Sequence, residues 1–233
     1  MQVVILAGGL GSRLRPLTNR VPKSLIEIQG RPFLEYQIEL LKRNEISDIV
    51  LCVGYLAEQI KDYFRDGKEF GVNIQYSEED KELLGTAGAL KKAEPLLEET
   101  FFVLDGDSYL PLDYAEVMSY FKKRDKLALL VVYRNYNRYD RSNVVIDAEM
   151  VKVYSREKQV PGMIYIHAGL SIVTKEALAL VPDGQPVSQD ELWSKLISRN
   201  ELLAFETDCR FYEVGSFSGL EEFRQLMGQR GNN

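Results

Sequence analysis

Short apolar runs alternate with amphipathic segments through the first half of the chain, and this alternation limits the possible folds more than any other feature. The apolar runs span residues 3–6, 49–53, 74–76, 101–104 and 127–132. Apolar residues at helical spacing separate them near 33–43, near 57–64 and from Gly88 onward. Strand–helix–strand units with nearly continuous apolar strands form parallel sheets that helices cover on both faces. The pattern predicts an α/β fold with a doubly wound, Rossmann-like, mainly parallel mixed sheet.

The pattern changes near Asn143, where the expected strands become shorter. They span 144–146, 151–154 and 164–173, and Gly162 and Gly169 interrupt them. These segments predict a second, smaller lobe of mixed strands. Because no linker rich in Ser, Gly or Pro separates the two parts, we expect a single domain over residues 1–233, with a first half over 1–135 and a second over 136–233.

The charge balance and the cysteines limit the kind of partner and the compartment. The chain of 233 residues carries 29 Lys and Arg against 35 Asp and Glu, a net charge of −6, whereas a nucleic-acid surface needs clustered cations. Cys52 lies in an apolar run far from Cys209, so both are expected to be reduced structural thiols. No leader pattern is visible, and no apolar run has the length of a membrane span. We expect a cytoplasmic protein that binds neither nucleic acid nor membranes.

A glycine-rich, basic loop follows the first apolar run. Glycines at positions 8, 9 and 11 let backbone N–H groups approach an anion, and Arg13, Arg15 and Lys23 add positive charge. The loop is not a dinucleotide fingerprint, because Leu14 stands where a third spaced glycine is needed, and it is not a P-loop, because its lysine follows Pro22. A plain surface turn would explain the glycines but not the interleaved cations. We expect the loop to bind a nucleoside triphosphate.

The order Gly-Gly-x-Gly-x-Arg-Leu-x-Pro-Leu-Thr, then Pro-Lys-x-Leu, covers residues 8–25 and resembles the signature of the sugar-1-phosphate nucleotidylyltransferases, or nucleoside-diphosphate-sugar pyrophosphorylases. Motifs at Gly85, Asp107, Lys158 and Glu213 extend the resemblance over nearly the whole chain. The chain is most similar to the short heptose- and mannose-1-phosphate guanylyltransferase branch. The resemblance implies the nucleotide-diphospho-sugar transferase fold, with a nucleotide-binding first half, a small sugar-binding lobe in the second half and no C-terminal β-helix domain.

Acidic residues at two places resemble the metal ligands of that family. Asp105 and Asp107 close the apolar run 101–104, and a carboxylate at such a strand end is well placed to hold Mg²⁺ against phosphate oxygens. The resemblance makes Asp107 a metal ligand and places Asp105 near the ribose. Glu213 stands where relatives usually have Asp and is implied to be the second ligand. Without the family, a solvated Asp-Gly turn and a strand carboxylate explain the same residues.

Small residues at 85–90 mark a point where a loop enters a helix. The helix N-terminus offers free N–H groups to a base or a phosphate, and helix capping by Thr86 is compatible with such binding. The resemblance places the nucleobase here, opposite residues at the end of the first strand. The implied nucleotide-binding residues are Leu6, Ala7, Gly8, Gly9, Gly11, Ser12, Arg13, Lys23, Gly85, Thr86, Gly88 and Asp105.

The second half supplies the implied sugar-phosphate site. Lys158 resembles the lysine of the Glu-Lys pair that contacts the phosphate in the family, although such a pair after a strand is usually solvated surface. His167, the only histidine, stands where relatives often have Asn, and a lone histidine is more often structural than catalytic. The implied substrate-binding residues are Asn143, Glu157, Lys158, His167 and Gly169.

These assignments imply one reaction, in which a sugar 1-phosphate oxygen attacks the α-phosphorus of an NTP in line and expels pyrophosphate. Because the nucleophile is already an anion, catalysis is expected to rest on positioning and charge neutralisation by Arg13, Lys23 and Asp107, with Mg²⁺ as the cofactor. The expected substrates are a nucleoside triphosphate, GTP being favoured over UTP and CTP, and a heptose or hexose 1-phosphate. The NDP-sugar product would serve glycan synthesis, such as that of lipopolysaccharide or capsule.

Two alternatives stay open at this point. A metal-dependent glycosyltransferase also holds its metal and nucleotide with Asp-x-Asp, here at 105–107, but its nucleotide-sugar donor carries no triphosphate for the basic loop. A catalytically silent, nucleotide-sensing subunit would explain the departures from the family pattern at Glu213, Ser216 and His167. The sequence also leaves the oligomeric state open, a homodimer included.

Overall fold

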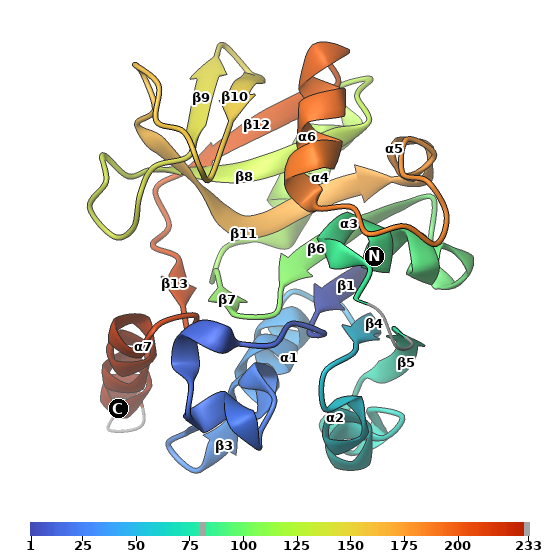
Figure 1. Ribbon diagram of the computed structural model, residues 1–233, viewed down its shortest axis with the longest axis vertical. Helices are drawn as coiled ribbons and strands as arrows, with labels where there is room; N and C mark the ends of the chain where they lie inside the picture. Colours follow the sequence, from blue (N-terminus) through green and yellow to red (C-terminus); the bar gives the residue numbers. More distant parts are fainter. Residues whose placement is uncertain (80–82, 231–233) are drawn as a thin grey trace.

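The computed structural model describes residues 1–79 and 83–230, and within these residues a nine-stranded sheet forms the centre of the molecule (Figure 1). The order across the sheet is β5-β4-β1-β6-β11-β8-β12-β10-β9. Its strands are β1 (Gln2–Leu6), β4 (Asp48–Val53), β5 (Asn73–Glu78), β6 (Thr100–Asp105), β8 (Ala128–Arg134), β9 (Val144–Asp147), β10 (Met150–Tyr154), β11 (Tyr165–Thr174) and β12 (Leu202–Thr207). Two short ribbons pair β2 (Glu27–Ile28) with β3 (Arg31–Pro32) and β7 (Ser108–Tyr109) with β13 (Tyr212–Glu213).

The sheet is mixed but mainly parallel, which confirms the predicted fold class. β1 runs parallel to β4 and β6, and β4 runs parallel to β5. β11 lies between β6 and β8 and is antiparallel to both, so β8 and its parallel neighbour β12 run in the direction of β1. Of the strands expected in a second, smaller lobe, β11 thus lies within this sheet, and β9 and β10 pair with each other and extend its edge.

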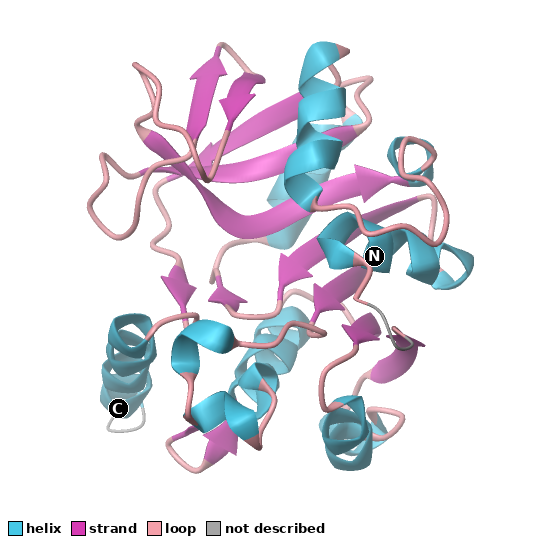
Figure 2. Cartoon of the chain, viewed as in Figure 1, coloured by secondary structure: helices cyan, strands magenta, loops and turns pink. Residues whose placement is uncertain are grey.

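Helices cover both faces of the sheet, as a doubly wound pattern requires (Figure 2). One core contains side chains of α1 (Phe33–Arg43), α2 (Ala57–Phe64) and α4 (Tyr114–Lys122), and the other contains side chains of α3 (Gly85–Ala93), α5 (Lys175–Leu178) and α6 (Gln189–Ser198). Alternation along β1 sends Val3 and Ile5 into the first core and Val4 into the second. In the part of the chain that is described, no helix is long and apolar enough to cross a membrane.

A third apolar cluster fastens the C-terminal helix, α7 (Phe217–Arg230), to the loop after β1. Phe223 meets the rings of Phe33 and Tyr36 edge-on, with centroids 5.2 and 5.6 Å apart. Leu14 and Val214 are fully buried in the same cluster. Short 3₁₀ helices shape the connections: η1 (Ser12–Leu14), η2 (Leu17–Asn19), η3 (Lys23–Leu25), η4 (Lys68–Phe70) and η5 (Glu94–Leu96). The cluster thereby holds β13 near the carboxyl ends of β1 and β6.

A close approach inside β11 makes Gly169 important for stability. Its φ of +81° lies in the left-handed region, and a Cβ atom there would lie 2.2 Å from Ser108 Oγ and 2.4 Å from Ser108 Cβ. Ser108 is fully buried, so its side chain has no room to move aside. We expect Gly169→Ala to lower the free energy of unfolding by about 3 kcal/mol, measured by urea denaturation.

Gly30→Ala is the matched control for this substitution. Gly30 has a φ of +78°, but no atom lies within 4 Å of an added Cβ. It shares the backbone strain without the steric clash, so we expect a loss of about 1 kcal/mol. Equal losses in the two variants would mean that contact with Ser108 contributes nothing.

Candidate active site

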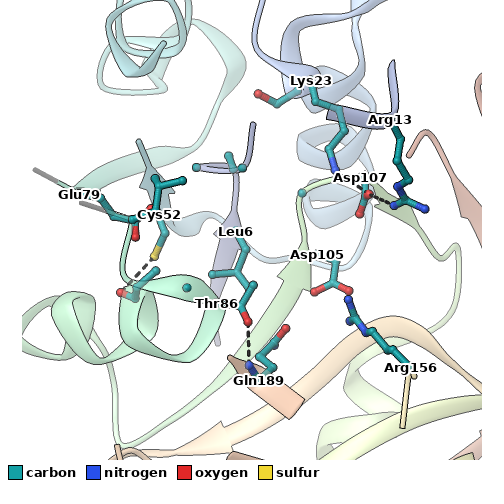
Figure 3. Close-up of a pocket in the computed structure, with 18 residues that line it drawn as sticks. Leu6, Arg13, Lys23, Cys52, Glu79, Thr86, Asp105, Asp107, Arg156 and Gln189 are labelled. Atoms are coloured by element: carbon teal, nitrogen blue, oxygen red, sulfur yellow. Dashed lines mark hydrogen bonds and ion pairs between the residues drawn. The ribbon is translucent and has the colours of Figure 1, made fainter. Parts of the chain in front are cut away.

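The carboxyl ends of the parallel strands open into a cavity of about 270 Å³. β1 ends at Leu6 and β6 ends at Asp105, and the loops after both strands line this cavity, as expected for a doubly wound sheet. Figure 3 shows Arg13 and Lys23 close together, with Asp107 between their charged groups. The predicted nucleotide-binding residues that line the cavity are Leu6, Ala7, Gly8, Gly9, Arg13, Lys23, Gly85, Thr86 and Asp105.

Gly11, Ser12 and Gly88 are absent from the described lining of this cavity. Gly11 shapes the loop, because its φ is +60° and its carbonyl oxygen accepts a hydrogen bond from Thr18 Oγ1 at 2.9 Å. Ser12 is exposed to solvent. A Cβ at Gly88 would lie 2.8 Å from the carbonyl oxygen of Gln185, so this glycine allows the segment before α6 to pack on α3. Gly11 and Gly88 therefore shape the segments around the cavity without lining it.

Lys23 and Asp107 form the central ion pair. Lys23 Nζ donates a hydrogen bond to Asp107 Oδ2 at 2.6 Å, and Arg13 Nη2 lies 3.9 Å from the same oxygen. Burial opposes ionisation of Asp107, but the positive charge of Lys23 and its hydrogen bond outweigh burial and hold the pKa of the carboxyl below its usual range. The preceding residue must be glycine, because a Cβ at Gly106 would lie 2.2 Å from the carbonyl oxygen of Leu6.

Glu213 lies beside Asp107, although the two residues are far apart in the sequence. β13 pairs with β7 so that Glu213 is opposite Ser108, and the backbone N–H of Val214 donates to the carbonyl oxygen of Asp107 at 2.8 Å. Burial, followed by the negative charge of Asp107, raises the pKa of Glu213 to about 7. Two neighbouring buried carboxylates therefore repel each other at this point.

This acid pair fits a magnesium ion. No group of three or more Asp, Glu, His or Cys side chains arranged as a metal site occurs within residues 1–79 and 83–230. Mg²⁺, however, is usually held by one or two carboxylates together with waters and substrate phosphates. A cation held by Asp107 and Glu213 would also remove the repulsion that raises the pKa of Glu213. The donor set is therefore suited to Mg²⁺ whose shell is completed by phosphate oxygens.

The N-terminus of α3 is less open than the sequence indicates. The N–H groups of Ala87 and Gly88 both donate to the carbonyl oxygen of Val187, at 2.9 and 3.1 Å. These two N–H groups are therefore not free for a ligand. Thr86 does not cap α3 either, since its Oγ1 accepts a hydrogen bond from the backbone N–H of Gln189 at 2.7 Å (Figure 3). The small residues here serve the packing of α6 on α3 as well as the cavity.

A second cavity, of about 310 Å³, adjoins the first. The two cavities share Arg13, Asp105, Asp107 and Arg156. The predicted residues Asn143, His167 and Glu213 line the second cavity. Gly169 is not part of either described lining, and its role is the close packing against Ser108. The acidic centre thus lies at the junction of two cavities.

The sequence predicts that Lys158 lines the substrate site, but in the structure Arg156 is the cation of this segment that lines the two cavities. Figure 3 shows the guanidinium of Arg156 beside Asp105. Lys158 and Glu157 are exposed and line neither cavity in the described part of the chain. Their backbone N–H groups donate to Ser155 Oγ, at 2.9 and 3.3 Å, so the chain turns immediately after Arg156. Arg156, whose side chain is 53% exposed, thus lines both cavities, whereas the Glu-Lys pair after it lines neither.

His167 is a neutral ring in the wall of the second cavity. Its side chain is almost completely buried, its Nε2 donates to the carbonyl oxygen of Leu170 at 3.2 Å, and Nε2 also lies 3.1 Å from Ser171 Oγ. Burial, with the positive charge of Arg156 as the second cause, lowers the pKa of His167 to about 3. His167 is therefore uncharged at neutral pH and is positioned by its neighbours.

The buried histidine predicts a specific dependence of stability on pH. Because the folded-state pKa lies below the unfolded value of 6.5, the unfolded chain takes up a proton that the folded chain does not, and stability is lost as the pH falls from 6.5 to about 3. His167→Asn removes this effect. Urea denaturation at several pH values should show the variant gaining relative to wild type below pH 6.5 and a constant difference above pH 7. A difference that does not vary with pH would contradict a neutral His167.

Several buried polar groups in the first cavity carry no sequence motif. Gln189 Nε2 and Ser24 Oγ are buried and have no hydrogen-bond partner among the residues that the structure describes. Glu79 also reaches the cavity and accepts a hydrogen bond from the backbone N–H of Leu84 at 2.6 Å. Buried polar groups without partners are rare, so these two are available to a ligand. The sequence marks the start of α6 by the capping box that begins at Ser188, but this box does not indicate that Gln189 reaches the cavity.

The strand-end cavities and the paired acids at their junction define an α/β protein that handles phosphate-bearing ligands. Residues 2–150 match the family described as nucleotidyl transferase, and the chain belongs to this family. It is 35% identical to D-glycero-alpha-D-manno-heptose 1-phosphate guanylyltransferase of Campylobacter jejuni, over 92% of this chain and 95% of the relative. It is 31% identical to UTP–glucose-1-phosphate uridylyltransferase of Synechocystis sp., over 92% of this chain and 60% of the relative.

Among solved structures, HddC from Yersinia pseudotuberculosis, complexed with GMP-PN, is similar with a TM-score of 0.80 and 27% identity. The match covers 97% of this chain and 99% of that chain. The chain thus spans nearly the full length of the Campylobacter and Yersinia proteins but only 60% of the length of the Synechocystis relative. The family and the fold expected from the sequence are both confirmed.

Proposed function

We propose that this chain is a sugar-1-phosphate nucleotidylyltransferase, which transfers a nucleoside monophosphate from an NTP to a sugar 1-phosphate and releases pyrophosphate. The observation that carries the proposal is the junction of two cavities at Asp107, which is paired with Lys23. One cavity has the basic glycine-rich loop in its wall, and Arg156 lines both. This arrangement lets two phosphate-bearing substrates meet at one point.

The proposed roles require no general base. Because the phosphate nucleophile is already an anion, positioning and charge neutralisation carry the catalysis. Lys23 and Arg13 neutralise the charge that moves onto the departing pyrophosphate. Asp107 and Glu213 would hold Mg²⁺, which would supply further neutralisation of the phosphate charges. Asp105, whose pKa burial raises to about 6, is assigned to the ribose.

Arg156 is proposed to bind the phosphate of the sugar 1-phosphate, because it lines both cavities, whereas Lys158 lines neither in the described part of the chain. We expect Arg156→Gln to lower kcat/KM for the sugar 1-phosphate by about 10², the effect of losing a charged, multiply hydrogen-bonding contact. Lys158→Gln is the matched comparison and should stay within about twofold of wild type. Steady-state kinetics of pyrophosphate release distinguishes the two, and the reverse ranking would assign the phosphate to Lys158.

GTP and a heptose or hexose 1-phosphate are the proposed substrates, with Mg²⁺ as the cofactor. The name of the Campylobacter relative and the GMP-PN complex of the Yersinia protein support a guanine nucleotide. The name of the Synechocystis relative makes UTP the competing donor. The NDP-sugar, formed in the cytoplasm, would enter glycan synthesis such as that of lipopolysaccharide or capsule.

The test is pyrophosphate release with Mg²⁺, in which each of four NTPs is combined with each of a panel of hexose and heptose 1-phosphates. Reactions with NTP alone serve as the control. The proposal predicts release that requires the sugar 1-phosphate and is greatest with GTP. Sugar-dependent release with UTP alone would keep the reaction but change the donor. Binding of NTP without release across the panel would support a silent nucleotide-sensing subunit.

A further inference from the structure

A third cavity, of about 580 Å³, lies next to the two that the proposed reaction uses. It shares Arg13, Asp140 and Glu213 with the second cavity, so the two are continuous. Its remaining wall comes from the segment between β8 and β9, from the segment before β13 and from the start of α7. The third cavity is larger than the second, so the site has more room than the second cavity alone provides.

Arg210 lines the third cavity. Its guanidinium carbon lies 3.4 Å from the ring centroid of Tyr139 and 4.8 Å from that of Phe211. Its Nη2 donates to both carboxylate oxygens of Glu222 at 2.9 Å. Its Nη1, in contrast, is buried and has no hydrogen-bond partner in the described parts of the chain. A buried charged donor without a partner calls for an acceptor from a ligand.

The chemistry of the wall favours hydroxyl groups over an anion. Three arginines are balanced by three acidic residues; the charged residues are Arg13, Arg138, Arg210, Asp140, Glu213 and Glu222. Anion sites carry excess positive charge, whereas a polyol needs donors and acceptors side by side, because each hydroxyl both donates and accepts. The partly exposed ring of Tyr139 adds an apolar surface that suits the C–H groups of a carbohydrate chain.

The wall between β8 and β9 is held in place before any ligand arrives. Asn135 Nδ2 donates to the carbonyl oxygen of Asp140 at 2.6 Å and to Ser142 Oγ at 3.0 Å. Ser142 Oγ also accepts from the backbone N–H of Asn137 at 3.0 Å. Asn135 and Ser142 are fully buried. A preformed wall binds a flexible polyol at a lower entropic cost than a loop that must order first.

Resting on the proposed function, the geometry leads to a narrower substrate class. We propose that the third cavity binds the exocyclic polyol chain of the acceptor, so that the enzyme selects sugar 1-phosphates whose side chain is longer than that of a hexose. The pyranose ring occupies the second cavity, and a hydroxyl of the longer chain accepts from Arg210 Nη1. Arg138, which belongs to no ion pair among the described residues, supplies a second donor.

The test compares a heptose 1-phosphate with the hexose 1-phosphate of the same ring configuration. Equilibrium affinity is measured by titration calorimetry with Mg²⁺, and kcat/KM is measured by pyrophosphate release. Wild type should favour the heptose 1-phosphate by about tenfold or more in both measurements, the scale of one hydrogen bond to a charged group. Arg210→Gln and, separately, Arg138→Gln should reduce this preference to within about twofold while leaving the values for the hexose 1-phosphate unchanged.

Tyr136→Ala is the matched control, because Tyr136 is 63% exposed in the same segment and is not part of the third cavity. It should keep the full preference. Arg138 is exposed, so its variant keeps the test valid even where Arg210→Gln fails to fold. Equal affinity for both sugars, binding of neither, or equal effects of the variants on both would overturn the inference. Heptose-selective binding without turnover on any sugar would instead overturn the proposed reaction and leave the third cavity as the site of selection.

Discussion

The Asp107→Asn variant is expected to lose about 10³ in kcat at saturating NTP and sugar 1-phosphate. The amide oxygen is a poor Mg²⁺ ligand, and the substitution also removes the anion that Lys23 contacts at 2.6 Å. The concentration of Mg²⁺ that gives half-maximal activity should rise in parallel. Pyrophosphate release measured over a series of Mg²⁺ concentrations tests both expectations.

Asp147→Asn controls for the loss of one carboxylate, because Asp147 is exposed at the end of β9, away from the cavities. It should behave like wild type. Glu213→Gln should shift the Mg²⁺ dependence in the same direction as Asp107→Asn, and the double variant should fall little below Asp107→Asn, since the two residues act as a unit. A loss of rate with an unchanged Mg²⁺ dependence would mean that Asp107 acts only by positioning Lys23.

Lys23→Ala is expected to lower kcat by about 10², the usual effect of removing one charge donor to a transition state. Lys23 donates a hydrogen bond to Asp107 at 2.6 Å, and it lines the first cavity. Its charge is needed most when negative charge moves onto the leaving pyrophosphate. The KM for NTP should therefore change less than kcat, which initial-rate measurements at several NTP concentrations will show.

Arg20→Ala removes a cation from the same loop region without touching any of the three cavities in the described chain. It should leave kcat within about twofold of wild type. A near-normal kcat for Lys23→Ala would exclude Lys23 from the catalytic site. A comparable loss in Arg20→Ala would assign the effect to the net charge of the loop.

The fold was predictable in the parts where the local pattern of apolar residues determines the secondary structure. Apolar runs that are buried on both faces marked β1, β4 and β6, and their parallel pairing placed Leu6 and Asp105 at one edge of the sheet. The direction of β11 was not predictable, because an apolar run of residues reads the same in either direction. The pairing of β9 and β10 with the main sheet likewise depends on contacts between distant segments.

The site was predictable where a residue lies next to its motif. Lys23 and Asp107 follow the basic loop and a buried strand, and the structure joins them. The choice between Arg156 and Lys158 depends instead on a turn at Ser155, which spacing alone does not reveal. Gln189 enters the first cavity only because α6 packs on α3 through Val187. Such residues are brought in by tertiary packing and leave no local signal.

The most direct test of the account follows the α-phosphate of the nucleotide. The enzyme is incubated with GTP labelled at the α-phosphate, Mg²⁺ and a heptose 1-phosphate, and labelled products and pyrophosphate are both quantified. We expect the label to move into an NDP-sugar in a one-to-one ratio with pyrophosphate, and Asp107→Asn to slow the formation of both by about 10³. The same incubation is repeated with each of the other NTPs labelled at its α-phosphate. Label that stays in the NTP with every sugar 1-phosphate, or that appears in free nucleoside diphosphate, would contradict nucleotidyl transfer at this site.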